Sequence, residues 1–195
     1  GRPCRMRYDR DDDFLITGKR HDFRIDYRAG VDDQGRILGL HVSHYTRAGW
    51  SLDLTLPVAD RAMLHTDNAY WLPAVRIVSH RLRTNMQSAT AFRGFGGPQG
   101  MLGMERVIDH IAHVLRLDPL AVRRANFYRP AQAARTGPGS ARRFVSTHSP
   151  APPEGEGPQT TPYGQPVTDF ILHEMVARLE ASSAYRARRA AVETW

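Results

Sequence analysis

The stretch Ala91–Gly100 (AFRGFGGPQG) decides the fold, because glycine, proline and aromatic residues are concentrated in it. Gly94, Gly96 and Gly97 permit backbone conformations that other residues rarely adopt, which predicts a tight turn. Pro98 suits the first turn of a helix. Apolar residues then recur at helical spacing, at Met104, Ile108, Ile111 and Leu115. The stretch therefore predicts a turn that leads from a strand into a helix.

The residues before this turn predict a β-sheet. The segment Phe23–Val42 reads as a β-hairpin with a turn at Asp32–Gly35, and Val75–Leu82 reads as a further strand. We also expect a short strand at Phe14–Thr17, after a charged turn, and a short helix near Asp60–His65. The apolar side of the hairpin consists of Phe23, Ile25, Tyr27 and Ala29 in the first strand and of Leu38, Leu40 and Val42 in the second.

Further helices are predicted after the long one. The segment Asp118–Asn126 begins with an aspartate that suits the N-cap and a proline that suits the first turn. The segment Ile171–Leu179 has the spacing of an amphipathic helix. Ser182 or Ser183 is expected to cap a last helix that runs through Ala191.

The composition divides the chain into three parts. Residues 129–160 are rich in Pro, Gly and Ala without periodicity, and they predict a flexible linker or insertion. We assign the two segments on either side of this linker, residues 1–128 and 161–195, to the same domain. The second segment is predicted to form a pair of helices. The fold class is predicted to be α+β, with a mixed β-sheet, a hairpin, and helices packed after the glycine-rich turn.

Composition excludes several classes of protein. The chain has 195 residues and a net charge of +7, but 26 of its 27 basic residues are arginines spread along the chain. No dense basic run or zinc finger supports nucleic-acid binding. No apolar run approaches the roughly 20 residues that span a bilayer, and no signal peptide is visible. The single Cys4 excludes an internal disulfide framework, so we expect a cytoplasmic protein that is a segment of a longer chain.

The glycine-rich turn has two possible roles. It either lets a strand meet a helix closely, or it lets the backbone approach a cofactor with a phosphate or oxyanion at a helix N-terminus that offers unpaired N–H groups. The dinucleotide fingerprint fails, since Gln99 occupies the position of its third glycine. Phe92 and Phe95 on either side of Arg93 favour a ligand, because such rings stack on a flat heterocycle while a guanidinium pairs with its oxygens.

Other groups of polar residues give weaker signals. Asp9, Asp11 and Asp13 alternate as in a calcium loop, but the glycine and glutamate that such a loop needs are missing. His110 and His113 share a helical face, and no carboxylate or cysteine completes a metal site with them. His41 and His44 point to opposite faces of a strand.

Five blocks of the sequence resemble the molybdenum-cofactor subunit of xanthine dehydrogenases, in the xanthine oxidase/aldehyde oxidase family. The central block is Thr84–Met101, which contains the glycine-rich turn. The other blocks follow the family's order, at Asp9–His21, Asp67–Tyr70, Val122–Tyr128 and Thr161–Gln165. The resemblance implies a partial molybdopterin-binding domain.

The resemblance implies roles for individual residues. Arg93 matches the arginine beside the molybdenum, where the backbone of Gly94, Gly96 and Gly97 approaches the cofactor. Phe95 matches an aromatic residue that stacks on the purine, and Phe92 lines the same pocket. Arg61 matches the arginine that pairs with a purine oxygen and stabilises developing charge, a feature that favours purines over aldehydes.

The implied activity is the oxidation of hypoxanthine and xanthine to urate by a molybdenum hydroxylase. Molybdenum-molybdopterin is the implied cofactor, with iron-sulfur clusters and FAD on other domains or subunits of a hetero-oligomer. No motif for the general-base glutamate is matched, and Glu154 and Glu156 lie in the predicted linker. The chain alone is therefore expected to be inactive. An aldehyde oxidase-like hydroxylase and a non-catalytic remnant that docks onto other subunits are the alternatives.

Overall fold

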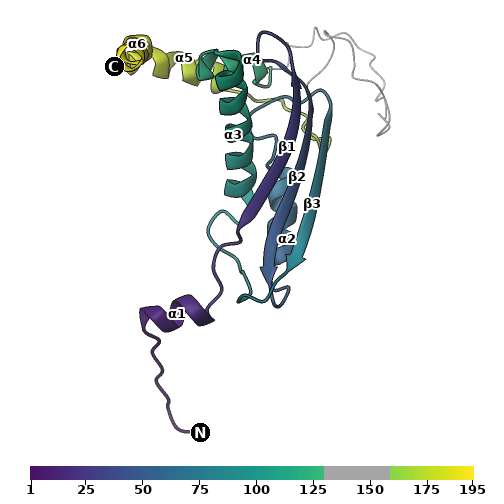
Figure 1. Ribbon diagram of the computed structural model, residues 1–195, viewed down its shortest axis with the longest axis vertical. Helices are drawn as coiled ribbons and strands as arrows, with labels where there is room; N and C mark the ends of the chain where they lie inside the picture. Colours follow the sequence, from purple (N-terminus) through teal and green to yellow (C-terminus); the bar gives the residue numbers. More distant parts are fainter. Residues whose placement is uncertain (130–158) are drawn as a thin grey trace.

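The computed structural model describes residues 1–129 and 159–195. The predicted linker over residues 129–160, with Glu154 and Glu156, lies almost entirely outside the described residues. Figure 1 shows a sheet and a long helix side by side, with the two chain ends at opposite ends of the molecule. None of the described helices combines the length and the apolar character needed to cross a membrane.

Three strands form the mixed sheet, in the order β1-β2-β3. β1 (Phe23–Val31) and β2 (Ile37–Gly49) are antiparallel, which confirms the predicted hairpin. β3 (Val75–Arg83) runs parallel to β2 at its other edge. Parallel neighbours need a crossover connection, and α2 (Thr55–Leu64) lies in it, longer than the predicted short helix. The predicted α+β class is confirmed.

A bulge near the hairpin turn changes which side chains face inward. The pairing shifts between Gly30, opposite Gly39, and Val31, opposite Ile37, so Leu38 has no partner of its own. Ile37 is 3% exposed and Leu38 is 58% exposed. The prediction that Leu38 belongs to the apolar side was wrong, because a one-residue bulge interrupts strict alternation.

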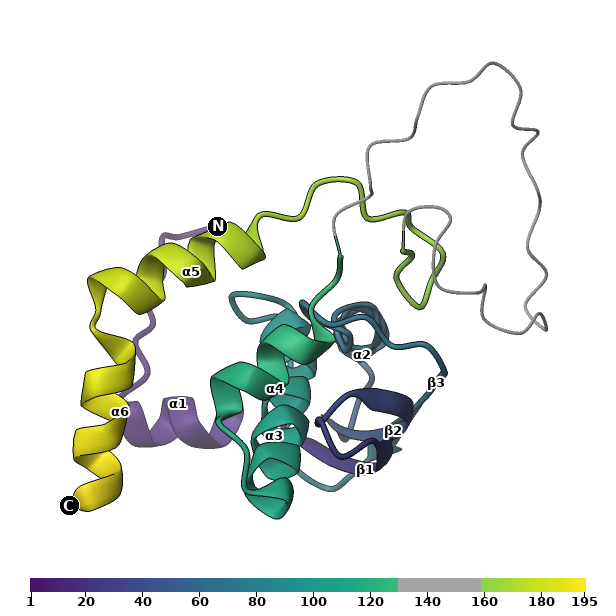
Figure 2. The same ribbon diagram turned by 90° about the horizontal axis from the view of Figure 1, so that it is seen from above.

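Two helices cover one face of the sheet. α3 (Gly97–Leu115) lies along β1, as predicted from its apolar spacing, and α2 packs against α3, β2 and β3. Every second residue of β2 from Leu40 onward is buried beneath them. Figure 2 shows α4 (Pro119–Asn126) folding back beside α3. The shared apolar core includes Leu40, Val42, Tyr70, Met104, Val107, Ile108 and Val122.

The C-terminal helices extend from this core. α5 (Leu172–Ser182) contacts α4 through an ion pair between Arg124 and Glu180, 2.6 Å apart. α6 (Tyr185–Thr194) follows after Ala184, which adopts a left-handed conformation at φ +48°. The prediction that Ser182 or Ser183 caps α6 was wrong. Both hydroxyls donate instead to the carbonyl of Leu179, at 3.4 and 2.6 Å, and so satisfy the end of α5.

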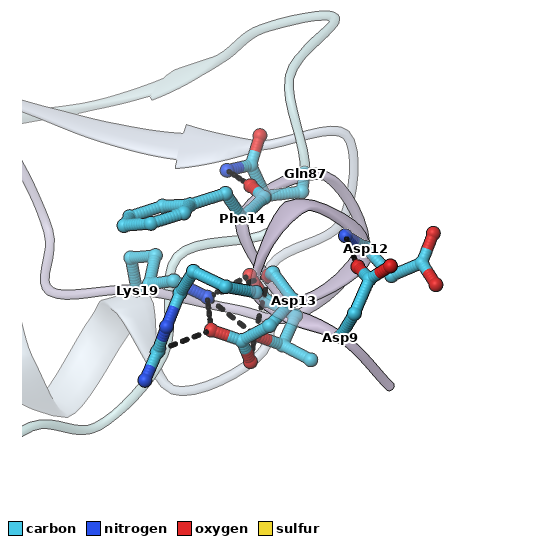
Figure 3. Close-up of polar contacts among 8 residues, drawn as sticks. Asp9, Asp12, Asp13, Phe14, Lys19 and Gln87 are labelled. Atoms are coloured by element: carbon cyan, nitrogen blue, oxygen red, sulfur yellow. Dashed lines mark hydrogen bonds and ion pairs between the residues drawn. The ribbon is translucent and has the colours of Figure 1, made fainter. Parts of the chain in front are cut away.

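The predicted strand at Phe14–Thr17 is wrong, since α1 (Arg10–Ile16) is a helix there. The Asp9 carboxylate accepts from the backbone N–H of Asp12 at 2.8 Å and caps it (Figure 3). Acidic residues fill its first turn, where the helix dipole favours negative charge. The capping interaction and the dipole outweigh the β-propensity of an apolar run of only a few residues.

His44 is an unusual component of the core. Its side chain is fully buried on β2, its Nδ1 atom has no partner within the described residues, and its Nε2 lies 3.5 Å from the Thr66 hydroxyl. The ring of Phe23 packs against it edge-on, with ring centroids 5.9 Å apart. Burial removes His44 from water, which disfavours the charged imidazolium and lowers the pKa of His44 to about 4.

Acid should therefore destabilise the folded chain. Below pH 6.5 the unfolded chain binds a proton at His44, whereas the folded chain does not until pH falls to about 4. The contribution to stability is complete above pH 6.5 and declines through this window by about 3 kcal/mol. Urea unfolding between pH 7.5 and 4.5 measures it. His44→Gln should flatten the pH dependence and the exposed-residue control His113→Gln should not; identical slopes would contradict the assignment.

Candidate cofactor and substrate site

The glycine-rich turn is a run of left-handed residues. Gly94, Phe95 and Gly96 have φ angles of +88°, +50° and +98°. Hydrogen bonds close the turn from the N–H of Phe95 to the carbonyl of Phe92, at 2.8 Å, and from that of Gly97 to the carbonyl of Gly94, at 3.0 Å. A phenylalanine in this conformation is uncommon, which indicates that the turn constrains it.

The conformation of the turn is fixed by α2. A Cβ atom at Gly96 would lie 2.0 Å from the carbonyl oxygen of Val58, and one at Gly100 would lie 2.3 Å from that of Ala62. The approach at Gly97 is less close, since the side-chain Cδ2 atom of His65 lies 3.2 Å from its Cβ position. Gly96 and Gly100 therefore serve helix packing, which is one of the two roles that the sequence left open.

The start of α3 does not offer the unpaired N–H groups that the sequence suggested. Pro98 has no N–H, and the N–H of Gln99 donates to the carbonyl of Gly96 at 3.2 Å. The turn provides such groups instead. Within residues 1–129 and 159–195, the N–H groups of Arg93, Gly94 and Gly96 have no protein acceptor. The unpaired donors lie in the turn and not at the start of α3, because the carbonyls of Gly94 and Gly96 accept from the first N–H groups of the helix.

Side chains of the turn project outward. Phe92 is 57% exposed, Arg93 is exposed and Phe95 is half-buried. Arg61, also exposed, lies in the last turn of α2, next to the Ala62 backbone that contacts Gly100. The structure thus brings the α2 turn that carries Arg61 against the glycine-rich segment. Neither Arg61 nor Arg93 forms an ion pair within the part of the chain that the structure describes.

Arg20 is a residue of this site that the sequence analysis missed. Its guanidinium lies over the ring of Phe92 and donates to the carbonyl of Arg93 at 2.6 Å. Arg20 stands far from the turn in the sequence and belongs to no periodic pattern. The one signal that could have pointed to Arg20 is its place in the block Asp9–His21, which resembles the family.

Direct metal ligands are not gathered in the described parts of the chain, where no group of His, Cys, Asp and Glu could hold an ion. His110, from the predicted pair on α3, is hydrogen-bonded through Nδ1 to the Tyr27 hydroxyl at 2.5 Å. A metal at the turn would therefore have to arrive with ligands of its own.

Two of the resembling blocks form a structural pair. The Tyr128 hydroxyl donates to the Asp67 carboxylate at 2.6 Å, and the rings of Tyr70 and Phe127 stack with centroids 5.8 Å apart. The Tyr70 hydroxyl in turn donates to Glu105 at 2.6 Å. Burial is the main cause that raises the pKa of Asp67. These buried contacts fasten the chain after α2 to the chain after α4.

Comparison with known proteins now identifies the fold. Residues 1–127 match the family described as the molybdopterin cofactor-binding domain. The chain belongs to this family. It is 44% identical over 128 residues to the xanthine dehydrogenase of Calliphora vicina, an alignment that covers 66% of the chain and 10% of that protein. It is 38% identical over 193 residues to the xanthine dehydrogenase/oxidase of Mus musculus, covering 99% of the chain and 12% of that protein.

Known structures of related enzymes have the same fold as this chain. The aldehyde oxidoreductase of Desulfovibrio gigas superposes with a TM-score of 0.68 at 25% identity, over 96% of this chain and 18% of that one. The molybdopterin cofactor-binding domain described here spans about a tenth of the length of the curated relatives that it matches.

The residues of the turn fit an anionic cofactor that brings its own metal. The N–H groups of Arg93, Gly94 and Gly96, which have no acceptor in the described residues, are donors that suit the oxygen ligands of a phosphate or an oxo group. The Arg93 guanidinium adds a charged donor beside them, and Phe92 and Phe95 add flat apolar surface. No carboxylate pairs with Arg61 or Arg93 in the described residues, so the N–H donors of both guanidinium groups are available to a ligand.

Gly96→Ala should disrupt this site by destabilising the contact between the turn and α2. The new methyl group would collide with the Val58 carbonyl and strain a φ of +98°, which together should lower the free energy of unfolding by about 3 kcal/mol or more. Gly30→Ala is the matched control, since only the Gly39 carbonyl, at 4.0 Å, approaches its Cβ position. Chemical denaturation of both variants checks the expectation, and equal stability would refute it.

Proposed function

We propose that this chain is part of a molybdenum hydroxylase of the xanthine dehydrogenase type, which oxidises hypoxanthine and xanthine to urate. The main support is the turn at Phe92–Gly97, which is exposed over Phe92–Gly94 and combines free amide donors, a guanidinium and aromatic surface beside the α2 turn that carries Arg61. Similarity to xanthine dehydrogenases over most of the chain supports the same assignment.

Each side chain has a proposed task. Phe95 and Phe92 hold a flat purine by stacking, and Arg61 pairs with a ring oxygen and stabilises negative charge that develops there. Arg93 and the N–H groups of Gly94 and Gly96 hold the cofactor, with Gly97 shaping the turn. When bound, the molybdenum cofactor supplies the redox centre of the reaction.

Other parts of the enzyme complete the reaction in this proposal. The general base comes from a segment that this chain does not match. Iron-sulfur clusters and FAD on other domains or subunits of a hetero-oligomer carry electrons away. The helical pair over residues 161–195 belongs to the same domain as residues 1–128.

The assignment is tested on the intact protein that carries this chain. We expect it to contain molybdopterin, detected by mass spectrometry, and to reduce a dye acceptor when xanthine is added, with urate as product. The 195-residue chain alone is expected to show no turnover. An intact protein that binds no molybdopterin would favour a docking remnant and overturn the proposal.

Arg61→Met separates purine from aldehyde substrates. Loss of one electrostatic donor to developing charge typically costs about 100-fold in rate, so activity on xanthine should fall by that order. Activity on aldehydes, which lack the ring oxygen, should change little. Arg76→Met, which replaces an exposed arginine on β3, is the matched control and should leave both activities intact. Equal losses on the two substrates would remove the argument for purines.

A further inference from the structure

Arg20 contacts both residues at the start of the glycine-rich turn. Its Nη2 donates to the main-chain carbonyl of Arg93 at 2.6 Å. Its Cζ lies 4.2 Å from the centroid of the Phe92 ring, in cation–π geometry. One side chain therefore restrains the backbone of Arg93 and the ring of Phe92 together.

The segment that carries Arg20 is itself fixed along the turn. The carbonyl of Lys19 accepts from the N–H of Thr90 at 2.9 Å, and that of His21 accepts from Gln99 at 3.2 Å. A Cβ atom at Gly18 would lie 2.8 Å from the Ser88 carbonyl. We call Gly18–His21 the strap, because it contacts the chain before, within and after the turn.

The strap is anchored at its other end by α1. Lys19 donates through Nζ to the Asp13 carbonyl at 2.8 Å and pairs with the Asp13 carboxylate at 3.3 Å. Gln87, just before the turn, donates to the Phe14 carbonyl at 3.3 Å. Figure 3 shows these contacts gathered around α1. The helix thus fixes the strap and the approach to the turn as a unit.

Arg20 makes few contacts for a partly buried charge. Its Nη1 atom is buried and has no partner within the described residues, and no carboxylate there pairs with the guanidinium. An unsatisfied buried N–H costs free energy, so stability alone is a poor reason for an arginine here. Its one strong hydrogen bond and its aromatic contact both go to residues of the proposed site.

We infer that Arg20 is a positioning residue, which holds Phe92 and Arg93 in the orientation that they present to substrate and cofactor. The inference rests on the proposed function. Because Arg20 lies against the ring of Phe92 and donates to a main-chain carbonyl, it acts through the turn and needs no contact with the substrate itself. Holding reacting groups in place affects turnover more than affinity.

The test uses Arg20→Met and Arg20→Lys in the intact, cofactor-loaded protein. Methionine keeps an apolar stem and removes both the donor and the cation, and lysine keeps the charge without the planar group. We expect kcat on xanthine to fall at least about tenfold for Met and less for Lys, with a smaller change in KM. Arg24→Met, an exposed arginine paired with Asp26, is the control and should match the wild type.

Hydrogen exchange provides a readout that does not depend on turnover. The amides of Phe95 and Gly97, whose hydrogen bonds close the turn, should exchange faster in Arg20→Met, while amides inside α3 and the molybdenum content stay at wild-type values. Unchanged exchange and kcat would overturn the inference. Faster exchange throughout α3 would also overturn it, because that result describes a general structural role. If the wild-type protein holds no molybdenum, the proposed function fails, and exchange at Phe95 and Gly97 still tests the restraint by Arg20.

Discussion

The contact between Gly96 and α2 is the constraint on which the rest of the structure depends. The backbones meet so closely that a Cβ atom at Gly96 would lie 2.0 Å from the Val58 carbonyl. This contact sets the distance between α2 and α3, and the two helices together cover the inner face of β2. Since α2 also forms the crossover from β2 to β3, the position of the turn and the parallel pairing of the sheet are fixed by the same helix. The turn that is proposed to bind ligand is thereby a part of the core architecture.

Much of the fold could be predicted from local patterns. The hairpin follows from alternation around Asp32–Gly35, and α3 follows from the apolar spacing after Pro98. Predictions fail where one interaction decides between local alternatives. A side-chain cap at Asp9 makes α1 a helix, and a bulge turns Leu38 outward. Neither event leaves a signal in hydrophobic periodicity.

The candidate site could be predicted only in part, for a related reason. Arg93, Phe92 and Phe95 stand out because they are adjacent in a glycine-rich stretch, and Arg61 stands out through the family resemblance. Arg20 acts across 73 positions of the chain, and such a contact exists only once the strap and the turn are folded together. Sequence spacing also could not tell which glycines serve packing, because that depends on what faces each Cβ position.

The distribution of ion pairs explains why the arginines at the turn suit a ligand. Arg47, Arg81 and Arg123 each pair with a carboxylate, and the Asp60 carboxylate beside Arg61 is itself engaged by Arg81. Arg61 and Arg93 have no such partner in the described residues, so a bound oxygen ligand would not have to displace a carboxylate. An acceptor that reaches these exposed guanidinium groups gains charge-assisted hydrogen bonds at little cost in lost protein contacts. Because Arg81 engages the Asp60 carboxylate, this acid does not occupy the guanidinium of Arg61, as the proposed role of Arg61 at a substrate oxygen requires.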